Sequence, residues 1–338
     1  MRRLLWIWPV LVLGAAAHAR HADGTLDLII TPNNGVPVII APGEPFEATL
    51  ARRGALRLVS AEGRTLDLDP DWTALPGGMH RATCPTSGKL ATGTYALEAV
   101  AEGRTDTNAR AVFVTHPMPD YPVVHLSDVH IGRPNRDPAP EAVFRRLLEQ
   151  INGIRAAFVL ITGDLTQDGK PEEFRRFLEA LDTCVLPTFV SAGNHDRTAL
   201  NYEKTFGPLV YSFRYGPDGY LVFDTKDFVI ADALDTQVGE LQRLRRAIKP
   251  LRWSIGATHR YDPAMSMRSQ LVLFVDDPLD FLMFGHWHSE SEEKRVPWRT
   301  TPLVVTPAAF DGAWRLILVT QTGIHPQDVQ QAGAATGG

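Results

Sequence analysis

Five short apolar runs in the second half of the chain each lead directly into aspartate, asparagine or histidine, and no other feature constrains the fold as strongly. Helical patterns at 139–151, 171–181 and 236–248 separate several of these runs. Alternating strands and helices predict a layered α/β domain, in which ligands bind beyond the carboxyl ends of the strands. The polar segments are Ser127-Asp128-Val129-His130, Thr162-Gly163-Asp164, Gly193-Asn194-His195-Asp196, Thr258-His259 and Gly285-His286-Trp287-His288.

The side chains at these five strand ends are of the types that bind metal ions. They include five of the 11 histidines in the chain. The Asp-x-His and His-x-His spacings place two donors on the same side of an extended segment. Imidazole, carboxylate and amide oxygen together suit Zn, Mn, Fe or Co. The donors are too numerous for one tetrahedral ion, and they fit a pair of ions about 3.5–4 Å apart.

The first half of the chain has a different rhythm, which is typical of an all-β domain. Between 24 and 115, short alternating apolar runs are separated by turns rich in glycine and proline. This rhythm predicts a β-sandwich and resembles that of immunoglobulin-like or fibronectin-like modules. The prolines within 116–122 predict a stiff linker to a second domain at 123–325, and the tail at 326–338 is expected to be flexible. The apolar runs lie at 26–30, 37–40, 46–50, 55–60, 94–100 and 109–115.

The first 19 residues have the pattern of a secretory signal peptide. Met1-Arg2-Arg3 is basic, residues 4–17 are apolar, and Ala17-His18-Ala19 forms a small-residue cleavage site. The apolar run is short for a membrane span of about 20 residues. We therefore expect cleavage after Ala19 and a periplasmic or secreted mature protein without a transmembrane span.

Charge and cysteine content narrow the function classes further. The 34 basic and 39 acidic residues give a formal net charge of −5, and no segment is strongly basic. Nucleic acid is therefore not expected as the main partner, because binding to its backbone requires clustered positive charge. Cys84 and Cys184 are too few for a disulfide framework, while a single bridge and two unpaired thiols both stay open.

The five polar motifs, taken in this order, resemble those of the calcineurin-like metallophosphoesterase superfamily over about residues 120–320. The resemblance implies a four-layer α-β-β-α sandwich and a hydrolase that cleaves a small-molecule phosphomonoester or phosphodiester. It also implies two divalent or trivalent cofactor ions, with Mn, Fe and Zn as the expected metals. The first ion would be held by Asp128, His130, Asp164 and His288, and the second by Asp164, Asn194, His259 and His286.

The same resemblance implies catalytic roles. A metal-bridging hydroxide would attack phosphorus in line, while His195 would act as general acid or stabilise the transition state and Asp196 would orient its ring. Purple acid phosphatases, which are similar, have tyrosine three residues after the bridging aspartate. This chain has Gln167 there, which disfavours an iron–tyrosinate centre. The segment 163–169 looks closer to cyclic-nucleotide phosphodiesterases, although Thr258 precedes His259 where that branch often has a second histidine.

Other interpretations stay open at this level. A catalytically silent metal-binding scaffold could have the same fold, although every expected ligand position is filled. The β-sandwich could contact the cell envelope, with the enzyme attached to it. Two side chains next to or within the polar motifs also have open roles. Arg197 could bind a substrate phosphate, lie on the surface or contact the start of a helix. Trp287 is expected to point away from the ligands on either side of it.

Overall fold

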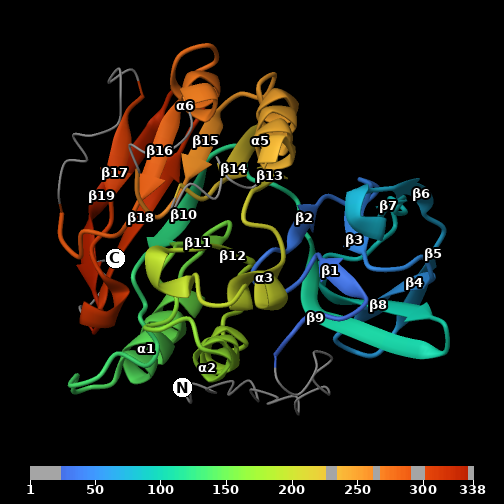
Figure 1. Ribbon diagram of the computed structural model, residues 1–338, viewed down its shortest axis with the longest axis horizontal. Coiled ribbons are helices and arrows are strands. Elements are labelled where there is room, and N and C mark those ends of the chain that lie inside the picture. The colour runs from blue at the N-terminus through green and yellow to red at the C-terminus, as the bar shows by residue number, and fades with distance from the viewer. Residues whose placement is uncertain (1–23, 226–233, 262–266, 291–300, 334–338) are drawn as a thin grey trace, which may run out of the picture.

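The structure, a computed structural model, describes residues 24–225, 234–261, 267–290 and 301–333. The expected signal peptide lies outside these residues. Within them the chain forms an all-β module followed by a larger module of sheets and helices (Figure 1). None of the helices in the described ranges is long and apolar enough to cross a membrane.

Two small sheets form the first module, and they enclose a shared apolar core. In β3 (Phe46–Leu50) every second side chain is buried, because alternate residues of a strand face the opposite sheet. The smaller, all-β sandwich expected from the sequence is thereby confirmed. One sheet has the order β1 (Ile29–Thr31), β3, β7 (His80–Cys84), β6 (Asp71–Ala74), and the other has the order β2 (Val38–Ile40), β9 (Arg104–Val114), β8 (Gly93–Ala101), β4 (Ala55–Ser60), β5 (Thr65–Leu68).

The second module contains two five-stranded sheets with helices on both outer sides. Helices α1 (Pro140–Asn152) and α2 (Pro171–Leu181) lie on one side of the strands, and α5 (Leu234–Ile248) and α6 (Met267–Phe274) lie on the other (Figure 1). This arrangement confirms the four-layer α-β-β-α fold. The first sheet has the order β12 (Thr188–Ser191), β11 (Val159–Thr162), β10 (Tyr121–Leu126), β18 (Ala313–Val319), β19 (Ile324–Gln331), and the second has the order β13 (Tyr211–Tyr215), β14 (Asp218–Val222), β15 (Ser254–Ala257), β16 (Phe281–Phe284), β17 (Leu303–Val305).

Burial follows from this layering. Strands β11, β12, β15 and β16 are buried along their whole length, as expected of parallel strands that are covered on both faces. Helix α1 buries Val143, Leu147 and Ile151, which recur at helical spacing on one face. The apolar runs seen in the sequence are therefore the strands and helix faces of this core.

The structure corrects two of the boundaries expected from the sequence. Tyr121 and Pro122, assigned to the linker, belong to β10, and the Tyr121 side chain is fully buried. Residues 326–331, assigned to the flexible tail, belong to β19, which pairs antiparallel with β18. Strand β19 is mostly exposed at the sheet edge, so its side chains need not alternate between apolar and polar and the sequence carries no strand signal.

The two modules are joined by backbone hydrogen bonds that are distant in the sequence. The segment 33–36 lies along the edge of β12, where the Val190 amide donates to the Gly35 carbonyl at 2.9 Å. The Leu26 amide donates to the Lys204 carbonyl at 2.8 Å, in helix α3 (Asn201–Phe206). The first module thus covers the free edge of the first sheet of the second module.

Each module also buries one unpaired thiol. Cys84 and Cys184 are both free and buried. Of the two alternatives left by the sequence, two unpaired thiols therefore hold.

Candidate metal centre

The five polar strand ends meet at one place in the second module. Strands β10, β11 and β12 are parallel neighbours, as are β15 and β16, so the carboxyl ends within each set lie at the same edge. Donor atoms from both sheets approach one another closely enough to form two potential metal-binding groups. The groups are Asp128, His130, Asp164 and His288, and Asp164, His259 and His286.

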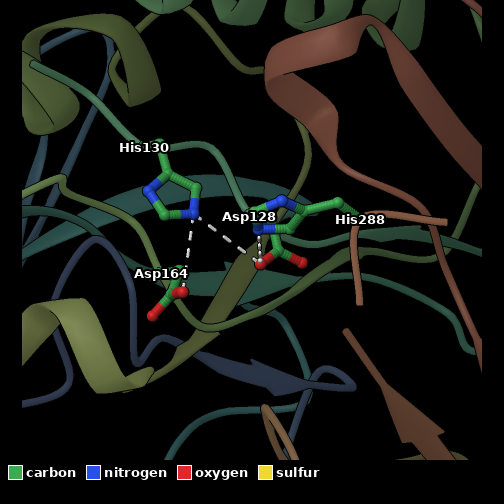
Figure 2. A group of neighbouring side chains, drawn as sticks. All are labelled: Asp128, His130, Asp164 and His288. Carbon is green, nitrogen blue, oxygen red and sulfur yellow. Dashed lines mark ion pairs between the residues drawn. The ribbon is translucent and has the colours of Figure 1, made fainter. Parts of the chain in front are cut away.

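The first group combines two carboxylates and two imidazoles that point toward one another (Figure 2). His288 Nε2 lies 3.2 Å from Asp128 Oδ1, and His130 Nε2 lies 3.5 Å from Asp164 Oδ2. Asp128 Oδ1 and His130 Nε2 are buried and have no hydrogen-bond partner within the described part of the chain. Because buried polar atoms are rarely left unsatisfied, these two atoms fit a cation between them.

The second group shares Asp164 with the first. His259 Nε2 lies 3.2 Å from Asp164 Oδ2 and 3.1 Å from His286 Nδ1. Asn194 begins the 3-10 turn η2 (Asn194–Asp196) beside this group, and the next amide, that of His195, donates to Asp164 Oδ1 at 2.9 Å. Six of the seven expected ligands thus fall into the two groups, with Asp164 common to both, and the seventh, Asn194, lies in the turn next to Asp164.

The backbone at five of these residues is in the left-handed region. Asp128, His130, Asp164, His286 and His288 have φ values of 56°, 50°, 51°, 72° and 58°. This conformation is unfavourable for residues other than glycine, and it concentrates at functional sites that the surrounding fold holds in place. The strain supports a functional role for these positions over a merely structural one.

Gly193 allows the loops after β11 and β12 to approach each other closely. A Cβ atom at this position would lie 2.1 Å from the Asp164 amide nitrogen. Any side chain would therefore displace the residue that both metal groups share, which explains the glycine before Asn194.

The burial of the site controls its charges. Burial alone would raise the pKa of Asp164, but His259 and His130 hold that pKa below its usual range. The interaction between Asp164 and His259 also affects the imidazole: despite burial, Asp164 raises the pKa of His259 to about 9. Burial lowers the pKa of His130 to about 4 and, together with His259, that of His286 to about 4. At neutral pH these two imidazoles are therefore uncharged, which is the form that binds metal.

Hydrogen bonds at the opposite ring nitrogens orient two of the imidazoles. His259 Nδ1 lies 2.8 Å from the Thr162 carbonyl, which can only accept, so Nδ1 carries a proton and Nε2 is the nitrogen directed at Asp164. His130 Nδ1 lies 3.1 Å from Gln167 Oε1, an acceptor, so Nδ1 carries the proton in His130 as well. Gln167 was not expected to serve the site. Its signal in the sequence was its position three residues after the shared aspartate.

The structure corrects the expected relation between His195 and Asp196. His195 Nδ1 lies 2.6 Å from the Gln167 carbonyl, not against a carboxylate. The Asp196 side chain is fully buried and accepts hydrogen bonds from the amides of Leu165, Thr166 and Gly193 and from the Thr166 hydroxyl, at 2.7–3.1 Å. A buried carboxylate requires such donors, and they hold it between the two loops, away from the His195 ring.

Two further side chains noted in the sequence have defined surroundings. Arg197 forms ion pairs at 3.4 Å with Glu203 and with Asp224, so its charge is already balanced. Trp287 is 37% exposed, and its ring contacts that of His286 edge-on, so it does not pack into the interior.

Comparison with known proteins gives a consistent result. The model of the calcineurin-like phosphoesterase family matches residues 121–290. A probable cyclic nucleotide phosphodiesterase of Vesicomyosocius okutanii is 23% identical over 216 residues, which cover 58% of this chain and 91% of that protein. A cAMP/cGMP dual specificity phosphodiesterase of Mycobacterium tuberculosis is 40% identical over 67 residues, which cover 18% of this chain and 21% of that one.

A solved structure with a similar fold is that of the purple acid phosphatase PPD1 from yellow lupin seeds. Its TM-score is 0.54 at 11% sequence identity, over 87% of this chain and 71% of that chain. The similarity extends over both modules, and it concerns the fold alone.

Proposed function

This chain belongs to the calcineurin-like phosphoesterase family of hydrolases that act on phosphate esters, and from that premise we propose that it hydrolyses phosphodiesters at a centre of two metal ions. The observation that carries this proposal is the pair of potential ligand groups that share Asp164. A diester is favoured over a monoester because the relatives described above are named phosphodiesterases. A catalytically silent scaffold is disfavoured because all seven expected ligand positions carry the expected residue types, and six of them belong to the two groups.

We propose that each ligand group holds one ion. Asn194 would complete the ligand set of the second ion. The donor set of carboxylate, imidazole and amide oxygen suits Mn, Fe or Zn. When bound, the ions would supply positive charge that polarises a phosphoryl oxygen and lowers the pKa of the attacking water. The unsatisfied Asp128 Oδ1 and His130 Nε2 support this use of the site.

His195 is proposed as the group that handles the leaving-group proton. Its ring lies 4.7 Å from that of His130, at the border of the first group. The Gln167 carbonyl accepts from Nδ1, so Nε2 is the nitrogen left to carry a proton toward the leaving oxygen. The Asp164 carboxylate accepts from the His195 amide, which keeps this turn beside the shared ligand.

Metal content and turnover of two variants test the proposal together. We expect about two ions per chain, chelator-sensitive turnover, and faster hydrolysis of bis-p-nitrophenyl phosphate than of p-nitrophenyl phosphate. Asp164→Ala should lose both ions and all turnover, whereas His195→Ala should keep the ions and lose roughly 10²–10⁴-fold in rate. Absence of bound metal after reconstitution with Mn²⁺, Zn²⁺ or Fe²⁺, or loss of the ions from His195→Ala, would contradict these assignments.

Export is proposed separately, on the signal-peptide pattern of the first 19 residues. We expect the mature protein to begin at Arg20 and to be recovered from the periplasm or the medium. The mass of the purified mature chain measures this, and an intact Met1 would argue against it. Contact of the first module with the cell envelope is a further proposal, which sedimentation of the mature protein with envelope fractions would test.

A further inference from the structure

A buried phenylalanine forms part of the wall around the first ligand group. Phe310 lies in the short 3-10 turn η5 (Ala309–Asp311) and is 5% exposed. Its ring contacts those of His130 and His288 edge-on, with centroids 5.3 and 5.0 Å apart. What packs on this ring therefore lies beside two of the proposed metal ligands.

Two arginines pack on the same ring. The Arg133 guanidinium carbon lies 4.2 Å from the Phe310 centroid, and that of Arg136 lies 4.6 Å from it. Both come from the loop that follows His130, where the Arg133 amide donates to the His130 carbonyl at 3.0 Å. The site thus gains two positive charges within one short loop, directly after a proposed ligand.

Among the residues that the structure describes, an acid balances only one of these two charges. Arg136 forms an ion pair with Asp311 at 3.0 Å. Arg133 is half-buried and has no ion pair within the described part of the chain. Two guanidinium groups on one ring repel each other. Contact with the Phe310 ring does not by itself explain why the charge of Arg133 has no acidic partner. The surplus positive charge therefore leaves room for an anion that the described part of the chain does not provide.

We propose that Arg133, with Arg136, binds a second anionic group of the substrate, a phosphate or a carboxylate that is not the group being hydrolysed. This inference rests on the proposed function, because it takes the reacting phosphate to lie at the metal centre. It makes Arg133 a specificity-determining residue: the preferred substrate carries at least one charge beyond that of the scissile ester. Planar guanidinium groups suit both phosphate and carboxylate, which accept two parallel hydrogen bonds.

The test compares two ligands that differ only in that second charge. 3-Phosphoglycerate and glycerol 3-phosphate have similar size, but only the first carries a carboxylate. Their affinities for the Mn²⁺-loaded full chain are measured by isothermal titration calorimetry, which needs no turnover. We expect the wild type to bind 3-phosphoglycerate about tenfold more tightly than glycerol 3-phosphate. Arg133→Gln should abolish that difference while leaving the glycerol 3-phosphate affinity and the metal content unchanged.

Two further variants sharpen the result. Asp311→Asn should free Arg136 and increase the preference for 3-phosphoglycerate, whereas a merely structural pair would show no gain. Arg214→Gln, an exposed arginine of β13, is the matched control and should change neither affinity.

The failure of this inference differs from the failure of the proposed function. If the wild type binds both ligands equally, or if Arg133→Gln weakens both alike, the second anion site is refuted while the metal centre stands. If neither ligand binds the metal-loaded protein, this inference is refuted, and if no metal is retained, the proposed function fails and this inference fails with it.

Discussion

Asp196 serves the centre by holding two loops together rather than by touching the His195 ring. Its four hydrogen bonds join the segment after Asp164 to the glycine before Asn194. Burial and the nearby Asp164 charge raise its pKa to about 6, so its four donors stabilise a carboxylate that would otherwise be costly to bury. Its effect on catalysis should therefore pass through the position of the ligands.

We predict that Asp196→Asn lowers both stability and metal content. The amide nitrogen of asparagine would face an N–H donor, which leaves buried groups unsatisfied and costs about 2–4 kcal/mol. Denaturant unfolding and elemental analysis measure the two effects. Asp168→Asn is the control, because Asp168 is an exposed carboxylate paired with Lys170. Normal stability and full metal content of Asp196→Asn would contradict this prediction. That result would favour the earlier expectation that Asp196 orients the His195 ring.

At this scale the sequence predicts residue types well and local geometry poorly. Asp128, Asp164 and His259 stand out because charged and imidazole side chains directly follow apolar strands. Gln167 does not stand out, because its two contacts, through Oε1 to His130 and through its carbonyl to His195, depend on how its loop folds back. Neither do the left-handed φ values of the ligands, which the surrounding structure imposes.

Among the elements, the edge of β12 depends on the segment 33–36 from the first module. At Gly35 the backbone has φ of 129°, and a Cβ atom would lie 2.4 Å from the Phe206 ring. Phe206 is fully buried at the end of α3, so it has little room to move. Gly35 is therefore the position at which this junction is most sensitive to a side chain.

We predict that Gly35→Ala lowers the free energy of unfolding by about 2–4 kcal/mol, through backbone strain and the clash with Phe206. Gly63→Ala is the matched control, because Gly63 also has positive φ but an added Cβ there would meet nothing within 4 Å. The control should lose only about 1–2 kcal/mol. Equal losses in urea unfolding of the two variants would show that the junction tolerates the side chain.

Elements with strong periodicity were predictable, and those without it were not. The range of α2 and the position of α1 follow from apolar spacing and from proline at the first helical position. Strands β5 and β6 are short and largely exposed, so their sequences lack the alternation that marks a half-buried strand. Helix α3 has only six residues, which is too short for a periodic signal.

For the whole molecule, the sequence predicts two modules but not their docking. The composition change near residue 116 separates the all-β rhythm from the alternating one. The contacts that join the modules are backbone hydrogen bonds, such as those of Leu26 with Lys204 and of Gly35 with Val190. Backbone groups are the same in every residue, so no residue pattern marks them in advance.

This docking predicts that the two modules unfold together, and the two thiols can report it. Cys84 belongs to the core of the first module and Cys184 to that of the second. Burial raises the pKa of Cys84 to about 12 and also raises that of Cys184. Because only the thiolate reacts, neither thiol should be alkylated in the folded protein at about pH 8.

Alkylation across a urea gradient, with the modified peptides identified by mass spectrometry, measures each site separately. We expect both cysteines to become reactive at the same urea concentration, because opening the first module exposes the edge of β12 and removes the partner of Gly35. Gly35→Ala should shift both midpoints down together. If Cys84 reacts at clearly lower urea than Cys184, the first module opens on its own, and the hydrogen bonds along β12 do not couple the two.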